Sequence, residues 1–294
     1  MRIANVYLKG IGPFERSGNI HGLAIDDDRV LLTGISGSGK STVLWAIAFL
    51  WRLLSPEPTE EEWPEGSIAM HITRLPAGEA LIVWSDDAAF QEEIKKRHPN
   101  VSIFITGKHH PHALRGVLST DNNMILLDAD FHFSDSKKDF FNAWFLTDDD
   151  VKDDWPKALS QLHMRNSLCS QEALKAVNRL LVDKKLVILP SGQVHVELRS
   201  NKSHTPQQMS MGERHMAVLC FCAACCLKQG GVLLLDEPAV HLHPSQVMGL
   251  LTTLEHFCRK TQGQMLLVSH NPAIWQRYEE LGLTVDLEAG HGGE

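Results

Sequence analysis

Gly34-Ile35-Ser36-Gly37-Ser38-Gly39-Lys40-Ser41 is the stretch that decides the fold, and it lies between two apolar segments. The segment before it, residues 29–33, predicts a short β-strand, and the segment after it, residues 42–50, predicts an apolar helix. The stretch fits the pattern G-x-x-x-x-G-K-[ST], which requires this order of strand, loop and helix. The sequence therefore predicts a phosphate-binding loop in an α/β fold.

The chemistry of such a loop follows from its backbone. Glycines allow conformations in which successive N–H groups point at one anion, and the N-terminus of the next helix adds positive potential. Lys40 is expected to reach the β- and γ-phosphates, and the Ser41 hydroxyl to bind Mg²⁺. ATP and Mg²⁺ are thus the predicted ligands, and the predicted nucleotide contacts are Gly34, Ile35, Ser36, Gly37, Ser38, Gly39, Lys40, Ser41 and Thr42.

A second apolar run, Val232-Leu233-Leu234-Leu235, ends in the carboxylates of Asp236 and Glu237. It predicts a buried parallel strand, and open α/β sheets bind their ligands at the carboxyl ends of such strands. Asp236 is expected to hold Mg²⁺ through water. Glu237 is expected to orient or deprotonate the water that attacks the γ-phosphate.

Two further motifs complete the candidate site. Ser210-Met211-Gly212-Glu213 precedes an apolar helix, and its hydroxyl and free N–H groups suit an anion. We therefore expect Ser210, Gly212 and Glu213 to contact nucleotide. The strand predicted at residues 266–268 is followed by His270, whose imidazole suits a hydrogen bond to the γ-phosphate or to the attacking water. The predicted catalytic residues are Glu237, Lys40 and His270.

The composition of the chain limits the kinds of partner that we expect. The chain has 294 residues, of which 43% are hydrophobic, and a net charge of −8, which does not favour nucleic acid as a partner. No apolar run is long enough to span a membrane, and the N-terminus lacks the pattern of a signal peptide, so we expect a cytoplasmic protein. Four cysteines crowd residues 220–226 without the spacing of a zinc site, which favours helix packing over metal binding.

The rest of the chain gives a coarser prediction. Two β-hairpins are expected, at residues 68–84 and 186–198. Helices are expected at residues 88–97, 139–145 and 156–164, with an acidic break at residues 148–150, and a further helix begins at a Ser170 cap. We expect residues 1–54 to form an N-terminal β portion with the phosphate-loop helix, residues 55–185 a mixed, partly helical insertion, and residues 186–294 the second half of the core.

In their order, these motifs resemble the set of the ATP-binding-cassette (ABC) ATPases. The sequence Asp236-Glu237-Pro238 followed by His241-Leu242-His243, and the opening at residues 3–14, are similar to the soluble branch of RecF, SMC and OLD-like ATPases, which includes compact ATPases of phage defence. The resemblance implies an α/β P-loop fold with a mostly parallel core sheet and an antiparallel β portion. It also implies a homodimer that holds ATP between Lys40, Ser41, Asp236 and Glu237 of one copy and Ser210 and Gly212 of the other, and that controls a separate effector protein.

Three points stay open. The glutamine that usually follows the phosphate-loop helix has only Gln91 as a candidate. An ABC transporter subunit is an alternative function. A nuclease in cis is another, because Asp128 and Asp130 have the D-x-D spacing of a Mg²⁺ site. The cluster His109-His110-Pro111-His112 is interpreted as a loop in preference to a metal site.

Overall fold

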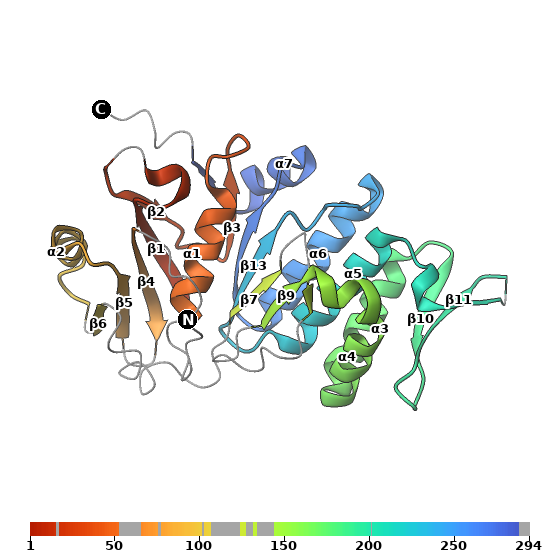
Figure 1. The fold of residues 1–294 in the computed structure, drawn as a ribbon. Helices are drawn as coiled ribbons and strands as arrows, with labels where there is room; N and C mark the ends of the chain where they lie inside the picture. Colours follow the sequence, from red (N-terminus) through yellow and green to blue (C-terminus); the bar gives the residue numbers. More distant parts are fainter. Residues whose placement is uncertain are drawn as a thin grey trace.

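The computed structural model describes residues 1–15, 18–52, 66–75, 78–101, 103–106, 124–127, 132–133, 144–200 and 202–287. A five-stranded sheet and a seven-stranded sheet lie on either side of helix α1 (Lys40–Arg52), as Figure 1 shows. The remaining helices of the second half of the chain cover the far side of the larger sheet.

The seven-stranded sheet is parallel apart from its last pair of strands. Its order is β15 (Leu283–Asp286), β3 (Arg29–Thr33), β14 (Gln264–Val268), β13 (Val232–Asp236), β7 (Met124–Leu127), β9 (Trp144–Thr147) and β8 (His132–Phe133). Only β8 pairs antiparallel, with β9. The predicted α/β class with a mostly parallel core sheet is confirmed.

The five-stranded sheet supplies the antiparallel portion. Its order is β2 (His21–Ala24), β1 (Arg2–Lys9), β4 (Ser67–Leu75), β5 (Gly78–Trp84) and β6 (Ile103–Thr106), and only β5 and β6 pair in parallel. The predicted hairpin of β4 and β5 is confirmed. Strands from both sides of residue 55 pair in this sheet, and the three-part division of the chain stays a prediction.

Side chains of the central strands point alternately to the two faces of the larger sheet, so each face has its own hydrophobic core. In β13, Val232 and Leu234 pack in the cluster that contains α1, while Leu233 and Leu235 pack with α5 (Met211–Cys226) and α6 (Pro244–Lys260). Successive side chains of a strand point to opposite faces, so α1 and α5 lie on opposite faces of this sheet. Helix α2 (Ala88–Arg97) covers the outer face of the smaller sheet.

The α5 side also carries α7 (Pro272–Leu281), α3 (Asp148–Arg165), α4 (Ser167–Leu180) and a small sheet of β10 (Lys184–Ile188), β11 (Val194–Leu198) and β12 (Ser203–His204). The hairpin predicted at residues 186–198 is confirmed by the pairing of β10 with β11. A short 3-10 helix, η1 (Gly12–Glu15), follows β1 in the chain. Another, η3 (Pro206–Gln208), lies shortly before α5.

Three local predictions in the middle of the chain are wrong. Trp144 and Phe145 lie in strand β9, not in a helix, because these aromatic residues favour strands and pair with β7. Residues 148–150 do not break the chain but begin α3. Helix α4 is capped by Asn166, whose side chain accepts a hydrogen bond from the Cys169 amide, so Ser170 lies inside the helix. Residues 139–143 lie outside the described residues.

The cysteines of α5 belong to the core. Cys220 and Cys222 are buried among apolar neighbours of α5, and burial raises the pKa of the Cys220 thiol to about 12. Among the described residues, no group of three or more His, Cys, Asp or Glu side chains is arranged to hold a metal ion. None of the described helices is both long enough and apolar enough to cross a bilayer.

One buried polar side chain joins the two sheets. Gln264, at the start of β14, accepts a hydrogen bond from the Ile3 amide at 2.8 Å through Oε1. Its Nε2 donates to the Ile3 and Ile25 carbonyls at 2.9 and 2.8 Å. Because these partners lie in or next to β1 and β2, the Gln264 carboxamide fixes the edge of the smaller sheet to the larger one.

We predict that Gln264→Leu lowers the free energy of unfolding by about 3 kcal/mol, because it leaves several buried backbone groups without partners. Urea unfolding measures this difference. The matched control is Gln229→Leu at an exposed position, for which a change below about 0.5 kcal/mol is expected. Equal effects of the two substitutions would contradict the role of Gln264.

Candidate functional site

Parallel pairing brings three chain segments to one edge of the larger sheet. In register, Asp236 of β13 is paired with Val268 of β14, and Val268 is paired with Leu32 of β3. The glycine loop after β3, Glu237 after β13 and His270 after β14 therefore begin at the same carboxyl edge. This is the edge at which open α/β sheets bind ligands.

The glycine loop has the backbone that its sequence predicts. Gly34, Gly37 and Gly39 have φ values of 138°, 84° and 98°, in the region that side chains disfavour. Lys40 is the first residue of α1 and is only 5% exposed. Its ammonium group donates to the carbonyls of Gly34 and Ile35 at 2.8 and 2.7 Å, so the charge lies inside the curve of the loop.

The Phe14 ring packs against Gly39 of this loop, a contact that the sequence did not predict. A Cβ atom added to Gly39 would lie 2.7 Å from the Phe14 ring, which is itself 1% exposed. A Cβ atom added to Gly12 would make only an ordinary contact with the Thr42 side chain, at 3.5 Å. The Gly10–Phe14 segment is visible in the sequence as a break after the first strand, but nothing in that pattern indicates its target.

The two carboxylates at the end of β13 have different environments. Asp236 is 6% exposed at the end of the strand. Glu237 has a φ of 48°, and its amide donates to the Val268 carbonyl at 3.0 Å, so a strained backbone is held by the neighbouring strand. Non-glycine residues in this region cost about 1 kcal/mol or more and cluster at functional sites.

Glu237 and the segment after β14 form one cluster. The Glu237 Oε2 atom accepts from the His270 amide at 3.2 Å and from the Ser269 hydroxyl at 3.4 Å. Its Oε1 atom is buried and has no hydrogen-bond partner among the described residues, and the His270 Nε2 atom lies 3.7 Å away. The structure thus brings Glu237 and His270 together.

Ser210 and Glu213 cap the start of α5 reciprocally. The Ser210 hydroxyl accepts from the Glu213 amide, and the Glu213 carboxylate accepts from the Ser210 amide at 2.9 Å. Lys184 also donates to Glu213, at 3.0 Å. Burial on its own would raise the pKa of Glu213, but Lys184 and the Ser210 amide together hold that pKa below its usual range. The carboxylate of Glu213 is therefore engaged within the chain.

Gly212 fits against the turn that follows Glu237. A Cβ atom added at Gly212 would lie 2.2 Å from the His241 carbonyl oxygen. His241 itself has a φ of 64°. The start of α5 and the His241-Leu242-His243 turn are therefore in contact within one chain, so a shift of either segment moves the other.

One candidate residue is not part of this site. Gln91 lies in α2, where its Nε2 donates to the Ser85 carbonyl at 2.7 Å, and α2 packs on the outer face of the smaller sheet. The structure does not bring it to the glycine loop. Asp128 and Asp130, and the cluster at residues 109–112, lie outside the described residues.

The residues present fit a magnesium nucleotide. The loop offers backbone N–H groups and the N-terminus of a 13-residue helix, which suit phosphate oxygens. Ser41 on that helix and Asp236 on the neighbouring edge supply the oxygen ligands that Mg²⁺ prefers. The buried Glu237 Oε1 atom lacks a donor, and such an atom needs one.

Comparison with solved structures shows which fold the chain has. The chain is similar to the SMC head domain from Thermotoga maritima, with 14% identity, a TM-score of 0.52, and coverage of 97% of this chain and 94% of that one. It is similar also to an Smc head bound to the C-winged helix domain of ScpA, with 16% identity, a TM-score of 0.53, and coverage of 94% and 92%. The fold is therefore that of an SMC head domain.

Comparison of the sequence with protein families shows the family of this chain. The family described as "AAA domain, putative AbiEii toxin, Type IV TA system" matches residues 107–275, more than half of the chain. The chain belongs to this family.

Curated relatives match over a shorter stretch. The thiamine import ATP-binding protein ThiQ of Histophilus somni is 33% identical over 92 residues, which is 31% of this chain and 41% of that protein. ThiQ of Photorhabdus laumondii is 40% identical over 76 residues, 26% of this chain and 31% of that protein. The match thus spans less than half the length of these relatives.

We predict that Gly39→Ala destabilises the protein more than Gly37→Ala, by about 1–3 kcal/mol. Both glycines have positive φ, but a Cβ atom at Gly39 meets the Phe14 ring, whereas at Gly37 it meets nothing within 4 Å. Thermal and urea unfolding of the two variants measure the difference. Equal losses would mean that the Phe14 contact does not constrain the loop.

We also predict that Lys184→Met raises the pKa of Glu213. The folded-state pKa lies below the unfolded value, so the stability from this group is present above the unfolded pKa and is lost as pH falls through the folded pKa. The variant should lose the part of that acid dependence that Lys184 supplies, and the Ser210 amide should keep its own part. Carboxyl ¹³C NMR titration measures the pKa, with Lys185→Met as the control, and an unchanged Glu213 pKa would refute the pairing.

Proposed function

We propose that this protein is an ATPase that works as a nucleotide-dependent homodimer and controls a separate effector protein. The observation that carries the proposal is the meeting of the glycine loop, Asp236, Glu237 and His270 at one sheet edge. ATP is the substrate, and hydrolysis of its γ-phosphate is the reaction. The proposal includes a cytoplasmic location.

The residues have distinct parts in this reaction. The loop amides and Lys40 bind the phosphates, and Lys40 exchanges its two carbonyl contacts for phosphate oxygens. Ser41 and Asp236 would hold Mg²⁺, which supplies positive charge for the phosphate oxygens when bound. Glu237 accepts a proton or hydrogen bond from the attacking water through the Oε1 atom that lacks a partner. His270 lies beside that atom, where its imidazole can donate to the γ-phosphate.

The position of α5 supports a site that two copies share. Ser210 and Gly212 start a helix on the face of the sheet opposite to α1, so we infer that they complete the site of a second copy. Two exposed apolar side chains support this inference. Ile35 in the glycine loop is 68% exposed, and Met211 beside Ser210 is 53% exposed. A two-fold dimer that joins each loop to the other copy's α5 covers both side chains.

Control of an effector is the finer part of the proposal. The family's description names a putative toxin, and one similar structure is an Smc head bound to a domain of ScpA. Both suit a small ATPase that acts on another protein. We place this action in phage defence or DNA maintenance.

An ABC transporter subunit is the second candidate, because the curated relatives that match are ThiQ import proteins. Such a subunit needs a membrane permease as its partner. Affinity purification from membranes distinguishes the two functions. A permease that co-purifies favours transport, and a non-membrane protein that co-purifies favours effector control.

We predict that Lys40→Ala lowers ATP turnover by about 100-fold or more, since the phosphates lose their buried cation. Phosphate release assays measure it. The control is Lys185→Ala, an exposed lysine in β10 that is expected to leave turnover unchanged. Turnover that survives the loss of Lys40 would exclude the glycine loop as the ATP site.

We further predict that Glu237→Gln slows turnover and accumulates an ATP-bound dimer, because binding contacts persist while water activation is lost. Size-exclusion chromatography with and without ATP measures the dimer. Glu279→Gln, at an exposed position of α7, is the control. A Glu237→Gln protein that binds ATP and stays monomeric would contradict the switch.

A further inference from the structure

The peptide between Ser269 and His270 is held at both of its polar ends. Its carbonyl group, on Ser269, accepts a hydrogen bond of 2.6 Å from the indole Nε1 atom of Trp275. Its amide group, on His270, donates to the Glu237 Oε2 atom at 3.2 Å. The peptide is trans, so its C=O and N–H groups point in opposite directions within one plane. The Trp275 indole and the Glu237 carboxylate therefore hold this plane from opposite sides.

Trp275 reaches the peptide from the start of α7. The Asn271 side chain caps this helix by accepting from the Ala273 amide at 3.0 Å, and the Trp275 amide donates to the Asn271 carbonyl at 3.2 Å. Side chains of a helix lean toward its N-terminus, so the Trp275 ring leans back toward Ser269. The ring is partly buried and packs against the hydrophobic core on the α5 side of the larger sheet. This packing makes the ring a firm anchor for the peptide.

The Ser269 side chain adds a second contact to the same carboxylate oxygen. Ser269 is fully buried, and its Oγ atom accepts from the Asn271 amide at 3.1 Å. The hydroxyl hydrogen is then left to donate to the Glu237 Oε2 atom at 3.4 Å. These two donors to Oε2 belong to one short segment, which Trp275 holds in place. The Glu237 Oε1 atom, which has no partner among the described residues, remains the oxygen that can accept from another donor.

We propose that Trp275 is a positioning residue for ATP hydrolysis, because its indole N–H fixes the Ser269–His270 peptide and, through it, the orientation of the Glu237 carboxylate. This role rests on the proposed function, in which the Glu237 Oε1 atom receives the attacking water. Without the indole N–H, the peptide can turn, and the Oε2 atom loses its donors. The carboxylate then spends less time facing the water, so the chemical step slows. ATP binding is unaffected, because the phosphates contact the glycine loop and Lys40.

Two substitutions of Trp275 separate its hydrogen bond from its packing. Trp275→Phe keeps an apolar aromatic ring and removes the N–H group, whereas Trp275→His keeps a ring N–H at the place of the indole Nε1 atom and fills less of the core. We expect Trp275→Phe to lower kcat for ATP about three- to tenfold, the effect of one lost hydrogen bond, with KM unchanged. At about pH 8, where imidazole is neutral, Trp275→His should retain more of kcat than Trp275→Phe, although it is the less stable variant.

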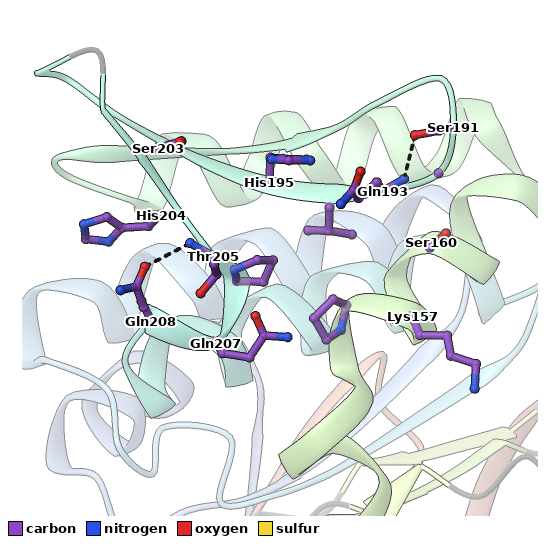
Figure 2. Close-up of a pocket in the computed structure, with 14 residues that line it drawn as sticks. Lys157, Ser160, Ser191, Gln193, His195, Ser203, His204, Thr205, Gln207 and Gln208 are labelled. Atoms are coloured by element: carbon purple, nitrogen blue, oxygen red, sulfur yellow. Dashed lines mark hydrogen bonds between the residues drawn. The ribbon is translucent and has the colours of Figure 1, made fainter.

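Trp155→Phe is the matched control, because it makes the same change in the α5-side core without removing a hydrogen bond. The Trp155 side chain is buried, and its Nε1 atom has no partner among the described residues. Trp155 lies in α3, which contacts β8, the last strand of the larger sheet. Lys157 of the same helix lines a hollow between α3 and the β10–β11 hairpin (Figure 2), and none of the described residues of that lining belongs to the Glu237 cluster. The control should lose stability and keep kcat.

A second measurement does not depend on turnover. In nucleotide-free protein, the backbone amide signal of His270 in a ¹⁵N–¹H spectrum should shift in Trp275→Phe and stay in place in Trp155→Phe. The positioning role is overturned if Trp275→Phe keeps the kcat of an active wild type, if Trp275→His is slower than Trp275→Phe, or if the His270 signal does not move. A wild-type protein without turnover would contradict the proposed function and this role with it, whereas an active wild type with an unaffected Trp275→Phe variant contradicts the role alone.

Discussion

Parallel pairing of β3, β14 and β13 is the constraint on which the rest of the structure depends. It aligns three strand ends, so that a glycine loop, a pair of carboxylates and a histidine from distant parts of the chain begin at one edge. The pairing also explains how a strained Glu237 backbone is held, because the Glu237 amide continues the ladder to the Val268 carbonyl. Function at this edge requires the register, and a slip of one residue would turn each strand's apolar side chains to the wrong face.

The same strands divide the protein into two cores, and this division shapes the proposed mechanism. Their alternate side chains pack against α1 on one face and against α5 and α6 on the other. Each face therefore carries one of the two segments to which the proposed function assigns phosphate binding. The His241 turn, which contacts Gly212, joins the α5 face to the carboxylate edge. A sheet between the two halves favours a site shared by two copies over a site within one chain.

Local patterns predicted the local backbone of the glycine loop and of the strand ends, and they missed the contacts between distant segments. The glycine loop, the strand before Asp236 and the cap at Ser210 depend on short-range geometry, and such geometry is written in consecutive residues. The contact of Phe14 with Gly39, the bridge from Gln264 to β1 and the strand at Trp144 depend on residues distant in sequence. No local pattern contains these contacts, and Gln91 was a poor candidate for the same reason.

The central claim is that each ATP is held between two copies, and mixing two inactive variants tests it most directly. Lys40→Ala removes one half of the site and Ser210→Arg removes the other. A mixed dimer contains one intact shared site, so the mixture should recover about a quarter of the wild-type turnover if copies pair at random. Recovery in the mixture, with neither variant active alone, is the predicted result. A mixture that stays inactive, or a Ser210→Arg protein that turns over ATP normally by itself, would contradict the account.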